Sequence, residues 1–147
     1  QLVDSCKTIA PLEYAISHPN EKEIAVDNID DLKEKVKTNK VAAIMFEVVQ
    51  GEGGVLPLEK AFVEKIFEIA NENDILTITD EVQTGNGRTG SLYAFQQYGF
   101  MPDIVTTAKG IGGGLPLGAT LLSEKWRCLK AKKICISAPT VPIAWSQ

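Results

Sequence analysis

The fold is decided by residues 41–80, which read VAAIMFEVVQGEGGVLPLEKAFVEKIFEIANENDILTITD. Residues 41–49 form a nearly continuous apolar run, as expected for a strand that is buried on both faces of a parallel sheet. After the glycine-rich turn, Pro57 stands where a first helical residue belongs, and apolar side chains recur at helical spacing up to residue 70. Residues 75–79 are again apolar and β-branched. The order strand, helix, strand predicts a βαβ unit and a parallel sheet.

The flanking segments continue this alternation. Asn28 is suited to cap a helix that ends at Asn39, and residues 91–98 have a helical pattern. Short strands are predicted at residues 103–107 and 118–122. We therefore predict an α/β fold, with a mainly parallel sheet and flanking helices in one structural unit.

Composition narrows the classes of function. The chain has 147 residues, of which 44% are hydrophobic and 23% charged, and its formal net charge is −4, as is typical of one globular domain. It has no basic run interleaved with aromatic residues, no apolar run of membrane-spanning length and no visible export signal, so we expect neither nucleic acid nor membrane as a partner. Three cysteines without metal-ligand spacing indicate free thiols and a cytoplasmic protein. With His18 as the single histidine, we expect neither a catalytic triad nor a histidine-rich metal site.

Ionisable residues stand at the ends of three predicted strands. Glu47 lies near the end of the first strand, Asp80 directly follows the second, and Lys109 comes shortly after the third. In a parallel sheet these ends share one edge, where ligands bind. A lysine that forms a Schiff base and a carboxylate that keeps a pyridine nitrogen protonated suit the chemistry of pyridoxal 5'-phosphate. Gln83 would be a neutral donor near the cofactor ring.

Other interpretations of the same residues remain open at this point. A lysine after a strand is most often simply solvated, and Asp80 also suits a turn cap. A nucleotide-hydrolysing site is disfavoured because the sequence lacks the glycine-rich phosphate loop with its Lys-Ser or Lys-Thr pair. Residues 85–90, GNGRTG, match the dinucleotide-binding pattern but begin too far beyond the preceding strand. A non-catalytic interaction protein that keeps the sheet is a further alternative.

Three sequence blocks carry a family resemblance. FEVVQGEGG at residues 46–54, TDEVQTGNGRTG at 79–90 and PDIVTTAKGIGGGLPLGA at 102–119 resemble the signature blocks of class III aminotransferases. Within that class they are most similar to the acetylornithine aminotransferases. The resemblance extends from about residue 24 to about residue 125, and it implies the large domain of a fold-type I aminotransferase.

The resemblance also implies roles for individual residues. Lys109 would be the catalytic Schiff-base lysine that also moves the proton between substrate and cofactor carbons. Asp80 would lie opposite the pyridinium nitrogen and Gln83 near the phenolic oxygen of pyridoxal phosphate, while Glu52 would lie over the substrate side. No metal is implied.

The implied reaction transfers an amino group from N-acetylornithine, or a related ω-amino acid, to 2-oxoglutarate in arginine biosynthesis. Other members of the class act on ornithine, 4-aminobutyrate or succinyl-diaminopimelate, and these substrates stay open as alternatives. The partners would be a small-molecule amino donor and a 2-oxo acid, and full-length members of the class work as homodimers.

Several positions depart from the family pattern. Val48 follows Glu47 where a proline is usual, and Asn86 replaces a commoner apolar residue. We interpret residues 1–125 as part of the cofactor-binding large domain, and residues 126–147 as an atypical tail that is either truncated or frame-shifted. The upstream phosphate-binding turn, the aromatic that stacks on the ring and the small domain are not recognisable in the sequence. We therefore expect little or no transaminase activity from these 147 residues alone.

Overall fold

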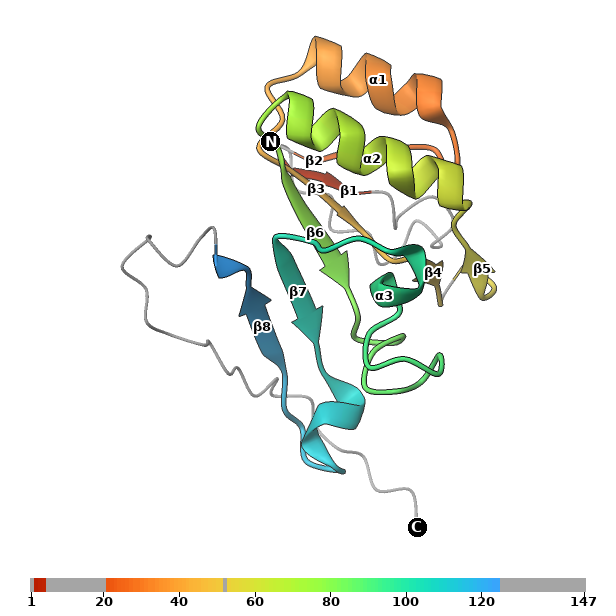
Figure 1. Ribbon diagram of the computed structural model, residues 1–147, viewed down its shortest axis with the longest axis vertical. Coiled ribbons are helices and arrows are strands. Elements are labelled where there is room, and N and C mark those ends of the chain that lie inside the picture. Colours follow the sequence, from red (N-terminus) through yellow and green to blue (C-terminus); the bar gives the residue numbers. More distant parts are fainter. Residues whose placement is uncertain (1, 5–20, 52, 125–147) are drawn as a thin grey trace.

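The computed structural model describes residues 2–4, 21–51 and 53–124, and its central feature is a mainly parallel sheet (Figure 1). Within these residues the strands follow the spatial order β2-β1-β3-β6-β7-β8. Their bounds are Leu2–Asp4 for β1, Glu21–Glu23 for β2, Ala43–Phe46 for β3, Leu76–Asp80 for β6, Ile104–Thr107 for β7 and Ala119–Leu122 for β8. Within this six-stranded sheet the neighbouring strands run parallel, except that β8 is antiparallel to β7. The predicted α/β fold with a mainly parallel sheet is confirmed.

The predicted βαβ unit lies at the centre of the sheet. Strand β3 leads through helix α2, Lys60–Glu72, to strand β6, and the two strands pair in parallel with Phe46 opposite Thr79. Helix α1, Ile29–Thr38, lies beside α2 (Figure 1). The two helices pack their apolar sides together with the sheet into one core.

The two faces of the sheet differ in burial. Ile44 and Phe46 in β3 are fully buried and belong to the same core cluster as Phe62 and Val63 of α2. Their paired neighbours in β6, Thr77 and Thr79, are also buried, whereas the alternate residues of β6 are half-buried. Successive side chains of a strand point to opposite faces. Asp80 therefore belongs to the face that α2 does not cover.

Helix α1 begins and ends at the predicted residues. The Asn28 side chain accepts a hydrogen bond of 3.0 Å from the backbone N–H of Asp31, and Asn39 is the C-cap. The Asp31 carboxylate also accepts hydrogen bonds from the Lys35 amine and, at 2.7 Å, from the backbone N–H of Ala25. A side chain of the first turn thus joins the helix to the chain that enters it.

The prediction that Pro57 begins a helix is wrong. Residues Val49–Gln50 form strand β4, which pairs antiparallel with Leu56–Pro57, strand β5, and α2 begins only at Lys60. The chain reverses through the glycine-rich turn, where Gly54 has a φ of 105° that suits a glycine. The single strand predicted at residues 41–49 is in fact two strands, because Val49 leaves the large sheet and pairs with β5.

The predicted helix at residues 91–98 is also shorter than expected. Helix α3 comprises only Phe95–Tyr98. The fully buried Glu81 carboxylate accepts hydrogen bonds from the backbone N–H groups of Ala94, at 3.0 Å, and Phe95, at 2.9 Å. These bonds fix where the helix begins, because they satisfy the N–H groups of its first turn.

Candidate active site

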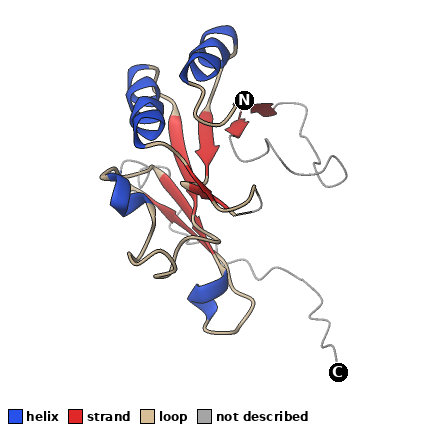
Figure 2. Cartoon of the chain, turned by 90° about the vertical axis from the view of Figure 1, so that its right-hand side faces the viewer, coloured by secondary structure: helices blue, strands red, loops and turns tan. Residues whose placement is uncertain are grey.

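The candidate site lies where β6 and β7 end. The parallel pairing of these strands sets Asp80 opposite Thr106, so both strands deliver their carboxyl ends to the same edge. The loop at residues 81–90 follows β6, and a single 3-10 turn, η1, at Lys109–Gly112 follows β7. Figures 1 and 2 both place η1 at the far end of the molecule from α1 and α2. The sequence predicts that Glu47, Asp80 and Lys109 converge at one edge of the sheet, and the structure places all three around one hollow there.

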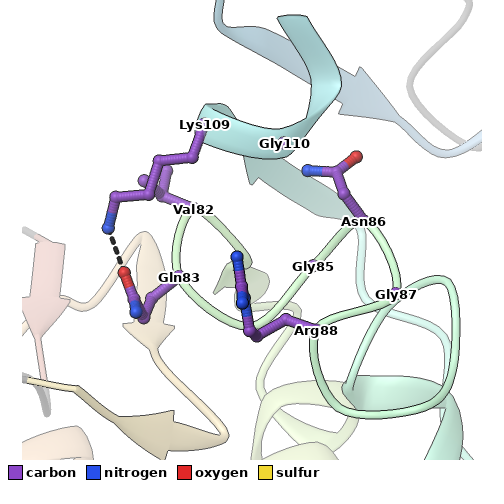
Figure 3. A pocket seen from close by; sticks show the side chains of 8 residues that line it. All are labelled: Val82, Gln83, Gly85, Asn86, Gly87, Arg88, Lys109 and Gly110. Carbon is purple, nitrogen blue, oxygen red and sulfur yellow. Dashed lines mark hydrogen bonds between the residues drawn. The ribbon is translucent and has the colours of Figure 1, made fainter. Parts of the chain in front are cut away.

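The Lys109 side chain is exposed and extends toward the loop at residues 81–90 (Figure 3). Its Nζ donates a hydrogen bond to Oε1 of Gln83, which is also exposed. The backbone of Lys109 has a φ of 49°, in the left-handed region that residues other than glycine rarely adopt. Two of the predicted site residues are therefore in direct contact.

Asp80 is half-buried and uses one of its oxygens locally. Its Oδ1 accepts a hydrogen bond of 2.9 Å from the backbone N–H of Val82. Within residues 2–4, 21–51 and 53–124, no group donates a hydrogen bond to its Oδ2. One oxygen is thus held by the loop, and the other is available to a ligand.

Asp80, Gln83 and Lys109 line a common hollow of about 690 Å³. The remaining lining residues come mainly from the turn after β3 and from the loop at 81–90, namely Glu47, Val49, Gly51, Val55, Val82, Thr84, Arg88 and Thr89. An adjoining hollow of about 320 Å³ shares Gln83, Arg88 and Lys109 with the first (Figure 3). The space has the size of a small-molecule site, for which volumes of about 300 to 1,000 Å³ are usual.

Glu47 stands before the glycine-rich turn and Glu52 within it. Glu47 lines the larger hollow, and its Oε2 accepts a hydrogen bond of 3.2 Å from the backbone N–H of Gly51. Glu52, the predicted substrate-side residue, lies outside the described residues. Its role stays a prediction.

Glu81 and Asn86 are residues of this loop whose roles the sequence did not indicate. The Glu81 carboxylate is fully buried and also accepts a hydrogen bond from the Thr84 hydroxyl, so it organises the loop rather than facing the hollow. The Asn86 amide donates hydrogen bonds to the Thr107 hydroxyl and to the Ala108 carbonyl, at 2.9 and 3.0 Å. Strand alternation offered a signal for Glu81, since neighbours in a strand face opposite sides. No local pattern could have found the partners of Asn86.

Neither a cluster of metal-binding side chains nor a membrane-spanning helix occurs in the described residues. No group of three or more His, Cys, Asp and Glu side chains in this part of the chain could hold a metal ion. None of its helices is long and apolar enough to cross a membrane.

Comparison with known families is decisive for the lineage. The model of the family described as aminotransferase class-III matches residues 4–130. This chain belongs to the class-III aminotransferases. The family resemblance that the three sequence blocks predicted is confirmed.

Relatives of this class-III chain include enzymes that are named for acylated ornithines. It is 48% identical over 102 residues to an acetylornithine aminotransferase from Haemophilus ducreyi, a match that covers 69% of this chain and 26% of that relative. It is also 48% identical over 118 residues to a succinylornithine transaminase from Citrobacter koseri, with 79% of this chain and 27% of the relative covered. The class-III chain thus spans about a quarter of the length of these relatives.

Solved aminotransferases share the fold of the class-III chain. The N-acetylornithine aminotransferase from Stenotrophomonas maltophilia superposes with a TM-score of 0.73 at 35% identity, over 84% of this chain and 32% of that one. An ornithine aminotransferase from Toxoplasma gondii superposes with a TM-score of 0.71 at 26% identity, over 83% of this chain and 32% of that one. The latter structure has partial occupancy of pyridoxal phosphate at its active site. The predicted fold, part of a fold-type I aminotransferase, is confirmed.

Proposed function

We propose that this chain is the cofactor-binding part of a transaminase that uses pyridoxal 5'-phosphate. The proposal rests above all on the hydrogen bond between the Lys109 amine and Gln83, in a hollow that Asp80 also lines. An amine and a carboxylate that face one space are the two side-chain groups on which this cofactor depends. The cofactor of a related ornithine aminotransferase lends further support.

The residues present fit the cofactor. The hollow of about 690 Å³ is large enough for a substituted pyridine ring, and the Lys109 amine at its edge is exposed. Among the described residues no group donates a hydrogen bond to Oδ2 of Asp80. This oxygen could therefore accept one from a protonated ring nitrogen. When bound, pyridoxal phosphate supplies an aldehyde that links covalently to amines and a protonated ring that withdraws electrons.

Each residue then has a defined task. Lys109 would hold the cofactor covalently through Nζ, and the same amine, once the substrate amine has displaced it, would move the proton between the substrate and cofactor carbons. Asp80 would accept a hydrogen bond from the ring nitrogen and so keep it protonated. Gln83 would orient the amine and lie near the phenolic oxygen of the cofactor. The family resemblance implies that Glu52 would lie over the substrate side.

The proposed amino donor is N-acetylornithine or a related ω-amino acid, and the proposed acceptor is 2-oxoglutarate, in arginine biosynthesis. The names of the Haemophilus and Stenotrophomonas relatives support the acetylated donor, whereas the Citrobacter relative keeps the succinylated one in contention. Ornithine, 4-aminobutyrate and succinyl-diaminopimelate are the remaining alternatives.

The proposal covers residues 1–125 as part of the large domain. The atypical tail at residues 126–147 lies outside the described residues and stays a prediction. The homodimer, inferred from full-length class members, and the cytoplasmic location, inferred from the cysteines, also stay predictions. Because the chain spans about a quarter of its curated relatives, we expect turnover by these residues alone to be slight or absent.

The test is the absorption spectrum of the purified chain with added pyridoxal phosphate, before and after borohydride reduction. We expect a band at about 420 nm that reduction removes, together with a covalent mass increase on the peptide that contains Lys109. Lys109→Ala should lack both, whereas Lys60→Ala, which removes an exposed lysine of α2, should keep both. If the mass increase falls on other lysines and persists in Lys109→Ala, the proposed role of Lys109 is wrong.

The amino donor can be tested on the same material without steady-state turnover. Each candidate donor is mixed with the loaded chain, and the loss of the 420 nm band is followed over hours, since about 420 nm is where the lysine-linked cofactor absorbs. The proposed substrate requires N-acetylornithine to act faster than ornithine and 4-aminobutyrate. Faster reaction with N-succinylornithine would move the assignment to the succinylated donor.

A further inference from the structure

Asn86 ties the loop at residues 81–90 to the segment that carries Lys109. Its Nδ2 donates to Oγ1 of Thr107 at 2.9 Å and to the carbonyl oxygen of Ala108 at 3.0 Å. The same carbonyl accepts a hydrogen bond from the backbone N–H of Ile111, at 3.3 Å, in the 3-10 turn η1. One amide group therefore holds both the last residue of β7 and the peptide unit directly before Lys109.

The backbone around Lys109 needs such support. Lys109 has a φ of 49° and Asn86 a φ of 57°, both in the left-handed region. Asparagine tolerates this region because its short polar side chain bonds locally, whereas lysine has no such help. A strained lysine backbone persists only where its surroundings hold it.

The two segments also lie too close together for a change at one to leave the other undisturbed. A Cβ on Gly110 would lie only 3.1 Å from Cβ of Asn86, so glycine permits the approach. Figure 3 shows Asn86 beside Gly110, while Gln83 of the same loop faces the Lys109 amine. The loop thus holds Lys109 at two points, its amine through Gln83 and its backbone through Asn86.

We propose that Asn86 is a positioning residue, which fixes the Ala108 carbonyl and thereby the direction in which the Lys109 side chain leaves the backbone. The inference rests on the proposed function, in which Lys109 links to the cofactor. Only a side chain with donor hydrogens can bond to the Ala108 carbonyl, so neither a carboxylate nor the apolar residue that is commoner at this position could replace the amide there.

Two substitutions remove the amide while keeping the left-handed backbone. Asn86→Asp preserves the shape of the side chain but has no donor when ionised, and Asn86→Gly removes the side chain without adding charge. The matched controls are Asn73→Asp and Asn73→Gly. Asn73 donates a comparable hydrogen bond of 2.8 Å to the Ile69 carbonyl at the end of α2, away from the hollow.

The first readout is the rate at which the full chain forms the visible band with pyridoxal phosphate. We expect both Asn86 variants to form it about tenfold more slowly, because they lose the bonds that aim Lys109. The second readout, in the absence of cofactor, is acetylation of Lys109 by acetic anhydride, which releases acetate, measured by mass spectrometry relative to Lys60. Release of the amine from Gln83 should make this reaction about threefold faster.

Opposite changes in the two rates distinguish positioning from general loosening, which would leave the Lys109 to Lys60 ratio unchanged. The Asn73 variants should match the original chain in both readouts. The inference is overturned if both Asn86 variants behave like the Asn73 variants. If the original chain forms no visible band, the proposed function fails, and the acylation ratio alone then decides whether Asn86 positions Lys109.

Discussion

Asp80 and Glu81 are adjacent in sequence, yet their carboxylates lie in opposite environments. Asp80 lines the hollow beside Lys109, whereas Glu81 is fully buried and accepts hydrogen bonds from Thr84, Ala94 and Phe95. Strand alternation at the end of β6 separates the two side chains. Asp80 therefore faces the hollow of the candidate site, whereas Glu81 belongs to the architecture of the loop.

This separation predicts that Glu81→Gln mainly lowers the stability of the fold, whereas Asp80→Asn mainly weakens cofactor binding. Glu81→Gln should lower the free energy of unfolding by about 2 to 4 kcal/mol, because an amide cannot accept from all three buried donors. Asp80→Asn should change it by less than about 0.5 kcal/mol, since the amide oxygen still accepts from Val82. Urea denaturation measures both values.

Cofactor binding should show the reverse order. Asp80→Asn is expected to weaken binding of pyridoxal phosphate about tenfold, because the ring nitrogen loses a charged acceptor. Glu81→Gln should leave the affinity of the folded fraction within about threefold. Equal loss of stability in the two variants would contradict the assignment of the carboxylates to opposite faces.

The ionised Asp31 carboxylate should contribute to the free energy of unfolding, and this contribution should be lost in acid. Burial raises the pKa of this carboxyl, but the hydrogen bonds from Lys35 and from the backbone of Ala25 outweigh burial and hold the pKa below its usual 3.8. A pKa lowered by folding means that the ionised group stabilises the protein above pH 3.8, and that this contribution disappears as the pH falls through the lowered value.

Asp31→Asn should therefore lower the free energy of unfolding by about 1 to 2 kcal/mol at neutral pH, and the difference from the original chain should shrink below pH 3.8. Urea denaturation as a function of pH is the measurement. Asp30→Asn is the matched control, because Asp30 is the exposed neighbour in the same helical turn. A constant difference across the acid range would show that the Asp31 carboxylate does not act through its charge.

The Tyr98 hydroxyl should make the stability of the fold depend on pH at alkaline pH as well. Its hydroxyl donates to the carbonyl oxygens of Leu58, at 3.0 Å, and Val48, at 3.2 Å, and so joins α3 to the hairpin of β4 and β5. Burial, with a smaller contribution from the negative charge of Asp27, raises the pKa of Tyr98 above its usual 10.0. The stabilisation is complete below pH 10.0 and is lost as the pH rises through the raised value.

Tyr98→Phe should cost about 1 to 2 kcal/mol of unfolding free energy at neutral pH, and the variant should lack this alkaline loss. Tyr93→Phe serves as the control, because Tyr93 stacks on Phe95 within the same segment. Thermal unfolding between neutral pH and the alkaline limit measures the effect. Identical alkaline profiles for Tyr98→Phe and the original chain would contradict it.

Features that depend on neighbouring residues were predictable from the sequence. The caps of α1 at Asn28 and Asn39 are local, because each bonds to a backbone group three or four residues away. The strands around Asp80 and Lys109 were equally readable, since buried parallel strands have continuous apolar runs. Convergence of these residues at one edge then followed from parallel topology alone.

Features that depend on distant partners were not predictable. Pro57 suits the first turn of a helix by its own preference, but pairing with β4 draws it into a strand. The length of α3 is set by Glu81, and the backbone at Lys109 is set by Asn86. These partners lie 13 to 22 residues apart in the chain, beyond any local pattern.

Gln83 and Asn86 lie on one short loop, and they contact Lys109 and its preceding peptide at the same time. The number of residues between Gln83 and Asn86 therefore sets the distance between these two contacts. An exchanged side chain disturbs one of the two contacts, whereas an inserted or deleted residue between them would displace both together. Among proteins related to this chain, the number of residues between positions 83 and 86 should vary less than the identity of those residues.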